Sequence, residues 1–192
     1  MPLIACRHFH GLIVGGDDVS YGQRPKDARH WREKMLREVT LDPARTHFLG
    51  KLPYDTYKKV LQVSAAHVYL TYPFVLSWSM LEAMASGCLV IGSRTAPVEE
   101  VIRDGENGRL VDFFDRGALA EAVVDHIDHR QRSGIHRVRA NLDMRERYAV
   151  ATGNAQYGGL LGDRTKIELA GTKNWADGAV GSSPARYLAC RV

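Results

Sequence analysis

The segment from Tyr72 to Ser93, YPFVLSWSMLEAMASGCLVIGS, contains a single charged residue, Glu82, among apolar, small and hydroxylic residues. An unpaired charge in apolar surroundings is unfavourable, so this carboxylate must have a partner. The partner is either a backbone N–H of the same helix or a ligand. Glu82 is therefore the first candidate for a functional residue.

Helical spacing predicts two faces for a helix over 77–86. One face carries small and polar residues at positions i, i+3, i+4 and i+7, namely Ser79, Glu82, Ala83 and Ser86. The other face carries Trp78, Leu81 and Ala85, which we expect to pack on a sheet. Small neighbours leave room for another molecule close to Glu82.

Two roles for Glu82 remain open at this point. Ser79-Met80-Leu81-Glu82 matches the S-x-x-E capping box, in which the glutamate satisfies a backbone N–H group. The alternative is a ligand site, because a helix N-terminus at the end of a strand attracts anions such as phosphate. The loop 93–100, with Arg94 and Pro97, offers further N–H groups, although it also fits an ordinary strand–helix connection.

The elements that must position these residues alternate between strand and helix. The patterns predict strands over 10–14, 46–49, 67–72, 88–92 and 109–111, and helices over 26–39, 53–64, 77–86, 97–103 and 117–129. The strands are continuous apolar runs, as in a parallel sheet that is covered on both faces. We therefore expect an α/β, Rossmann-like fold for residues 1–150. Residues 151–192 are rich in Gly, Ala, Ser and Thr, and we expect a poorly packed, disordered tail there.

Bulk composition fits an ordinary globular protein: 45% of its 192 residues are hydrophobic and 25% are charged. A net charge of +4 with scattered basic residues does not indicate a nucleic-acid partner. A cluster of Arg130, Arg132, Arg137 and Arg139 is either a solvated helix face or a peripheral contact with an anionic membrane. We find no signal peptide or membrane span, and three distant cysteines argue against disulfides, so we expect a cytoplasmic protein.

Metal binding is not expected from the sequence. Cys6, His8 and His10 form the nearest approach to a ligand cluster, and such residues are more often partly buried polar groups. We therefore predict no metal and no cofactor.

Three blocks of sequence resemble the C-terminal domain of the GT-B glycosyltransferases of family 4, or group 1. They are HFLGKLP (47–53), SMLEAMASGCLVIGS (79–93) and APVEEVIRDGENGRLV (96–111), in the family's order and spacing. The resemblance implies one half of a two-domain enzyme that uses a nucleotide-diphosphate sugar as its substrate. It further implies retention at the anomeric carbon.

The resemblance also implies roles for individual residues. Glu82 takes the second acidic position of the family's E-x7-E motif and binds the ribose hydroxyls of the donor. Backbone N–H groups of Ser77, Trp78 and Ser79 meet the diphosphate, and Leu52 lies against the base. The loop at Thr95, Ala96 and Pro97 completes the predicted donor site; catalytic residues are not identified.

Two departures from the family pattern limit these expectations. The first acid of E-x7-E is Phe74 here, so its usual contact with the sugar is missing. The family's cationic diphosphate clamp and its acceptor domain have no counterpart in the sequence. We expect a fragment that is inactive alone and needs an acceptor domain on another chain. The alternatives are a non-catalytic nucleotide- or protein-binding module and a non-functional remnant.

Overall fold

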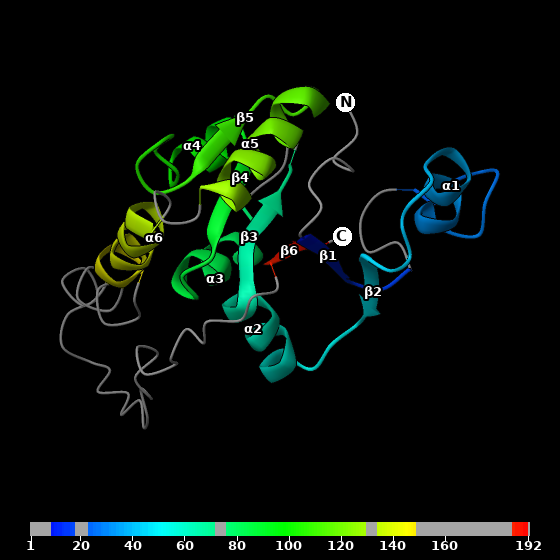
Figure 1. Cartoon of the computed structure of the whole chain (residues 1–192), viewed down its shortest axis with the longest axis horizontal. Helices are drawn as coiled ribbons and strands as arrows, with labels where there is room; N and C mark the ends of the chain where they lie inside the picture. Colours follow the sequence, from blue (N-terminus) through cyan, green and yellow to red (C-terminus); the bar gives the residue numbers. More distant parts are fainter. Residues whose placement is uncertain (1–8, 18–22, 72–75, 130–133, 149–185, 192) are drawn as a thin grey trace, which may run out of the picture.

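The computed structural model describes residues 9–17, 23–71, 76–129, 134–148 and 186–191, the last range as backbone alone. Strands and helices alternate over most of this part of the chain (Figure 1). The strands are β1 (Phe9–Val14), β2 (Thr46–Gly50), β3 (Ser64–Tyr69), β4 (Leu89–Ser93), β5 (Arg109–Val111) and β6 (Arg186–Arg191). The helices are α1 (Trp31–Glu38), α2 (Tyr54–Val63), α3 (Trp78–Ala85), α4 (Ala96–Glu99), α5 (Arg116–Asp128) and α6 (Gly134–Arg147).

The six strands form one parallel sheet in the order β2-β1-β6-β3-β4-β5. Helices cover both faces of this sheet, which confirms the predicted α/β, Rossmann-like class. Parallel pairing places the carboxyl ends of all strands at one edge, and the loops that leave this edge are where such folds bind ligands.

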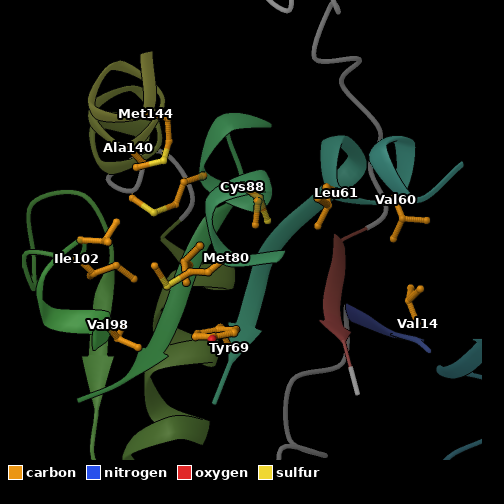
Figure 2. Close-up of a cluster of buried hydrophobic side chains, with 14 of the residues drawn as sticks. Val14, Val60, Leu61, Tyr69, Met80, Cys88, Val98, Ile102, Ala140 and Met144 are labelled. Atoms are coloured by element: carbon orange, nitrogen blue, oxygen red, sulfur yellow. The ribbon is translucent and has the colours of Figure 1, made fainter. Parts of the chain in front are cut away.

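Alternating side chains of β4 show how the two faces are filled. Leu89 and Ile91 pack with Val123 and Ile127 of α5, whereas Val90 packs into the larger cluster on the opposite face. That larger cluster, drawn in Figure 2, is built mainly from α2, α3 and α6 against the sheet. A strand between two helical layers buries both sets of side chains, which explains its continuous apolar sequence.

Element positions agree with the sequence-based predictions except at several ends. β3 begins at Ser64, three residues before the predicted start at 67, because α2 runs into the strand without a loop. Ala65 and Ala66 are almost fully buried in that strand, although alanine has little intrinsic preference for it. α1 begins at Trp31 instead of 26, since His30 caps it by accepting a hydrogen bond from the Glu33 N–H.

Two described elements, α6 and β6, were not predicted from the sequence. α6 packs on α3, where Arg137 Nε donates to the Gly87 carbonyl and Asn141 Nδ2 donates to the Ala85 carbonyl over 2.6 Å. These contacts satisfy carbonyl groups at the C-terminal end of α3. Of the arginine cluster, Arg137 is thus bound within the chain, Arg139 is exposed, and residues 130 and 132 lie outside the described residues.

The predicted tail lies mainly outside the described residues, which do not include 151–185 or 192. Its residues 186–191, for which we predicted no strand, form β6 in the interior of the sheet (Figure 1). Cys6 and His8 also lie outside the described residues. Elsewhere in the described part of the chain, no group of His, Cys, Asp and Glu side chains has the arrangement of a metal site. None of the described helices has the length and apolar character that a membrane span requires.

Candidate functional site

The loops after β3 and β4 are tied together at the carboxyl edge of the sheet. Ser93 is the fully buried last residue of β4, and its hydroxyl forms two hydrogen bonds with the backbone of Thr71. Its Oγ donates to the Thr71 carbonyl over 2.8 Å and accepts from the Thr71 N–H over 2.9 Å. This pair fixes the start of the segment that leads into α3 relative to the start of the segment that leads into α4.

The N-terminus of α3 is held by two side chains. Ser77 is the N-cap residue, and its Oγ accepts a hydrogen bond from the Ser79 N–H over 3.3 Å. The Tyr69 hydroxyl, at the end of β3, accepts from the Ser77 N–H over 2.9 Å. Strand β3 therefore positions the helix start directly, through a buried aromatic side chain.

This cap excludes the capping-box role of Glu82. With Ser77 as N-cap, the third residue of the helix is Met80, and Glu82 lies two positions beyond it. Of the two roles left open for Glu82, the capping box with Ser79 is therefore excluded, because Ser77 and not Ser79 is the N-cap residue. The Glu82 carboxylate is therefore available for a different contact.

Glu82 lies near Tyr54, the first residue of α2. Both residues stand near helix starts at the carboxyl edge, one after β2 and the other after β3. Partial burial and the nearby negative charge of Glu82 raise the pKa of Tyr54. Glu82 is half-buried and 54% of the Tyr54 side chain is exposed, so this pair lies at the surface and not beneath the core.

Fewer N–H groups are available at the start of α3 than the sequence suggested. The Ser77 N–H is bound to Tyr69, and the Ser79 N–H is bound to Ser77. Among the described residues, the structure shows no acceptor for the Trp78 N–H, which lies between them. The Trp78 side chain is 77% exposed, so it leaves this N–H accessible without packing into the core.

The loop before α4 also offers fewer donors than predicted. The Thr95 N–H donates to the Ser93 carbonyl over 2.9 Å, and Pro97 has no N–H. Helix α4 ends at Glu99 instead of 103 and is too short to carry a substantial dipole. The Arg94 side chain is already paired within the chain, since its Nη2 lies 2.7 Å from the Asp104 carboxylate. Only the Ala96 N–H in this loop has no acceptor in the described structure.

Leu52 lies half-buried in the connection between β2 and α2 and packs against the large hydrophobic cluster. The adjacent Lys51 side chain covers Gly16, where an added Cβ would come within 2.5 Å of it. This close approach brings the turn after β1 against the loop after β2. Leu52 and Tyr54 thus follow β2, while Ser77, Trp78 and Glu82 follow β3, so the predicted site has two sides.

Sequence reasoning did not find Tyr54, Tyr69 or Ser93. Tyr54 had a usable signal, since it follows Pro53 at a predicted helix start on the ligand edge. Tyr69 and Ser93 gave none, because their roles depend on hydrogen bonds to residues that only the folded chain brings near.

A hollow of ≈ 430 Å³ lies elsewhere, between α1 and the edge strand β2. Leu36, Val39, Leu41 and Phe48 contribute to its lining. Neither Glu82 nor the start of α3 takes part in it, so the hollow and the candidate site are separate features. The helix α1 has no buried residue, and Arg32 and Leu36 of this helix line the hollow.

A family model and a curated relative both match this chain, and both describe glycosyltransferases. Residues 1–129 match the family described as "Glycosyl transferases group 1". A phosphatidyl-myo-inositol mannosyltransferase of Mycolicibacterium smegmatis is 30% identical over 151 residues, which are 74% of this chain and 38% of that protein.

Similar folds occur among solved structures. HepE from Anabaena, solved in complex with UDP, has a TM-score of 0.66 at 21% identity, and the match covers 80% of this chain and 40% of HepE. Sucrose-phosphate synthase from Thermosynechococcus elongatus has a TM-score of 0.59 at 24% identity, covering 78% of this chain and 37% of the synthase. The chain thus spans about two fifths of the length of these relatives.

Proposed function

Since the chain belongs to the group 1 glycosyltransferases, we propose that its carboxyl edge binds the nucleotide part of a nucleotide-sugar donor. The transfer reaction would retain the configuration at the anomeric carbon of the sugar. The observation that carries this proposal is the position of Glu82. It is a half-buried carboxylate at the ligand edge with no capping duty, and it faces a hydroxyl from a second loop.

Glu82 would accept hydrogen bonds from the ribose hydroxyls. A carboxylate is an acceptor with two oxygens, and a ribose presents two adjacent hydroxyl donors. Such charge-assisted bonds are stronger than bonds between neutral groups. The proximity of Tyr54, whose pKa the charge of Glu82 raises, supports this role because it places a hydroxyl group near the carboxylate.

The diphosphate would lie at the start of α3. The Trp78 N–H and the positive end of the helix dipole favour negative charge there. Because Tyr69 and Ser77 already occupy two neighbouring N–H groups, this helix supplies a limited anion site. We therefore expect modest affinity, and the proposal needs no metal ion or cofactor.

Transfer to an acceptor would require a second domain that holds the acceptor. Glycosyl transfer needs donor and acceptor held together, and the residues assigned here all concern the donor. We expect the 192-residue chain to bind a donor without turning it over.

Calorimetry on the 192-residue chain tests the proposal, with UDP, UDP-glucose, GDP and ADP as ligands. UDP is the first choice because HepE was solved with it. Glu82→Ala should weaken binding by about 1–3 kcal/mol, the range for a hydrogen-bonded charge. Glu121→Ala, at an exposed glutamate of α5, is the matched control and should bind as the unmodified chain does.

The other outcomes are equally informative. Unchanged affinity with a lower free energy of unfolding in Glu82→Ala would assign the residue a structural role. Failure of all four ligands to bind would favour a module without nucleotide-binding function. Multiple-turnover transfer by the chain alone would refute the need for a separate acceptor domain.

A further inference from the structure

Strand β6 occupies an unexpected place in the sheet. It comes from the far end of the sequence, yet it lies between β1 and β3 and pairs in parallel with both (Figure 1). Its six residues match β1 one for one, from Phe9 opposite Arg186 to Val14 opposite Arg191. On its other side, residues 187–190 pair with β3.

The two halves of the sheet meet only through this strand. β1 pairs with β2, β3 pairs with β4, and β4 pairs with β5, but β1 and β3 do not pair with each other. Removing β6 would leave two unpaired edges facing each other. Backbone groups along both edges would lose their partners, and unpaired buried groups of this kind are unfavourable.

The place that β6 takes is the centre of a doubly wound sheet. From it, the chain runs outward through β1 and β2 on one side and through β3, β4 and β5 on the other. The order of strands reverses at this point, and such sheets bind ligands at the carboxyl edge beside the reversal. Helix α2 passes over the same region, with Leu61 fully buried there (Figure 2).

Both sides of the candidate site depend on this strand for their spacing. Leu52 and Tyr54 follow β2, which joins the sheet through β1, whereas Trp78 and Glu82 follow β3. β6 is the strand that sets the distance between β1 and β3. A shift or loss of β6 would separate the Tyr54 side from the Glu82 side.

We propose that residues 186–191 form a completing strand, which inserts between β1 and β3 of the same chain and must be inserted for the carboxyl edge to bind a nucleotide. The second part of this statement rests on the proposed function, and the first does not. The space between β1 and β3 fits one parallel strand, and residues 186–191 fill it.

Amide hydrogen exchange on the intact chain tests the first part. Peptides that cover 186–191 should exchange at least about 100-fold more slowly than an unstructured chain, as amides in a sheet interior do. Exchange of 186–191 at the unprotected rate, while β3 and β4 remain protected, would overturn the proposal. Light scattering on the same sample should show a monomer. Protection that appears only in a dimer would mean that the strand between β1 and β3 comes from a second copy of the chain.

Exchange in the presence of UDP tests the second part without any substitution. If binding requires β6, a concentration of UDP ten times its Kd should slow exchange of 186–191 about tenfold. Residues 116–128 of α5 serve as the internal control and should not change. Slower exchange in β3 without any change in 186–191 would overturn the coupling. Protection of 186–191 in a chain that binds no nucleotide would refute the proposed function and leave the completing strand intact.

A pair of substitutions in β6 tests independently whether UDP binding requires this strand. Leu188→Pro removes a backbone N–H from the middle of β6 and should raise the Kd for UDP at least about tenfold. Leu188→Val keeps the N–H and should bind as the unmodified chain does. Equal affinity in both variants would overturn the coupling, and the exchange experiments decide the matter if the proline variant does not fold.

Discussion

The Tyr54 side chain at the start of α2 lies close enough to Glu82, in the second turn of α3, for the negative charge of that carboxylate to raise the pKa of Tyr54. The two helices follow different strands, β2 and β3, which are not neighbours in the sheet. Glu82 thus lies near a residue of the opposite loop, on the other side of the candidate site.

Tyr54→Phe should weaken UDP binding by about 0.5–1.5 kcal/mol, because Glu82 then loses a nearby hydroxyl group that can orient it. The free energy of unfolding should change little, since Tyr54 is largely exposed and the phenylalanine keeps its ring. Calorimetry and urea unfolding measure the two quantities. Tyr148→Phe, at an exposed tyrosine that follows α6, is the matched control. Equal affinity in the Tyr54 variant would show that Glu82 needs no such support.

Trp78→Pro should weaken UDP binding by about 1.5–3 kcal/mol, because it removes the Trp78 N–H, which has no acceptor among the described residues. The substitution suits the local backbone. Proline is favoured at the first helical position, and Ser77 before it has ψ 142°, which proline requires of its predecessor. The helix should therefore remain as stable as before, which circular dichroism during thermal unfolding can check.

The control for this experiment is Trp78→Ala, which removes the exposed indole and keeps the N–H. It should bind UDP as the unmodified chain does. A similar loss in the alanine and proline variants would mean that the indole, and not the backbone N–H, contacts the nucleotide.

Asn107→Ala should destabilise the fold by about 2–4 kcal/mol, since buried groups would lose several hydrogen bonds at once. The amide donates to the Val101 carbonyl over 3.0 Å and to Asp143 over 2.6 Å, and it accepts from the Arg103 N–H over 2.7 Å. Urea unfolding measures the loss. Glu106→Ala, in the same turn but exposed, should stay within about 0.5 kcal/mol. A small loss in the Asn107 variant would show that water replaces these bonds.

Asp104→Asn should lower the free energy of unfolding by about 0.5–1 kcal/mol at neutral pH, as expected for partly exposed ion pairs. Burial raises the pKa of Asp104, but the Leu110 N–H, Arg94 and Arg109 together lower it below its ordinary value of 3.8. The stabilisation is therefore present above this ordinary value and is lost as the pH falls through the lowered pKa.

Urea unfolding of both proteins at about pH 7 and about pH 3 checks this dependence. The difference between them should shrink at the lower pH, which lies below the ordinary pKa of 3.8, because the unfolded chain then binds the proton that folded Asp104 resists binding. A difference that is the same at both values would mean that the charge of Asp104 does not contribute.

Most of the fold could be predicted from local patterns. β4 is a continuous apolar run because both of its faces are covered, and its limits differed from the prediction by one residue at each end. The α5 pattern, with apolar residues at helical spacing, predicted its limits to within one residue. The unpredicted helix α6 has only Ala140 and Met144 as buried apolar residues in an arginine-rich sequence, so its apolar pattern is weak.

Within the candidate site, the sequence identified Glu82 as the lone carboxylate and placed it at the carboxyl edge of a parallel sheet, because strand and helix periods alone determine that arrangement. The sequence also left open a capping-box role for Glu82. The hydrogen bonds of Tyr69 and Ser77 exclude it, because they place the start of α3 two residues earlier than that box requires. The place of β6 was likewise decided only by tertiary structure. Six residues with apolar positions between two arginines carry too little pattern to predict a strand, and their pairing with β1 and β3 depends on edges that the rest of the chain must first form.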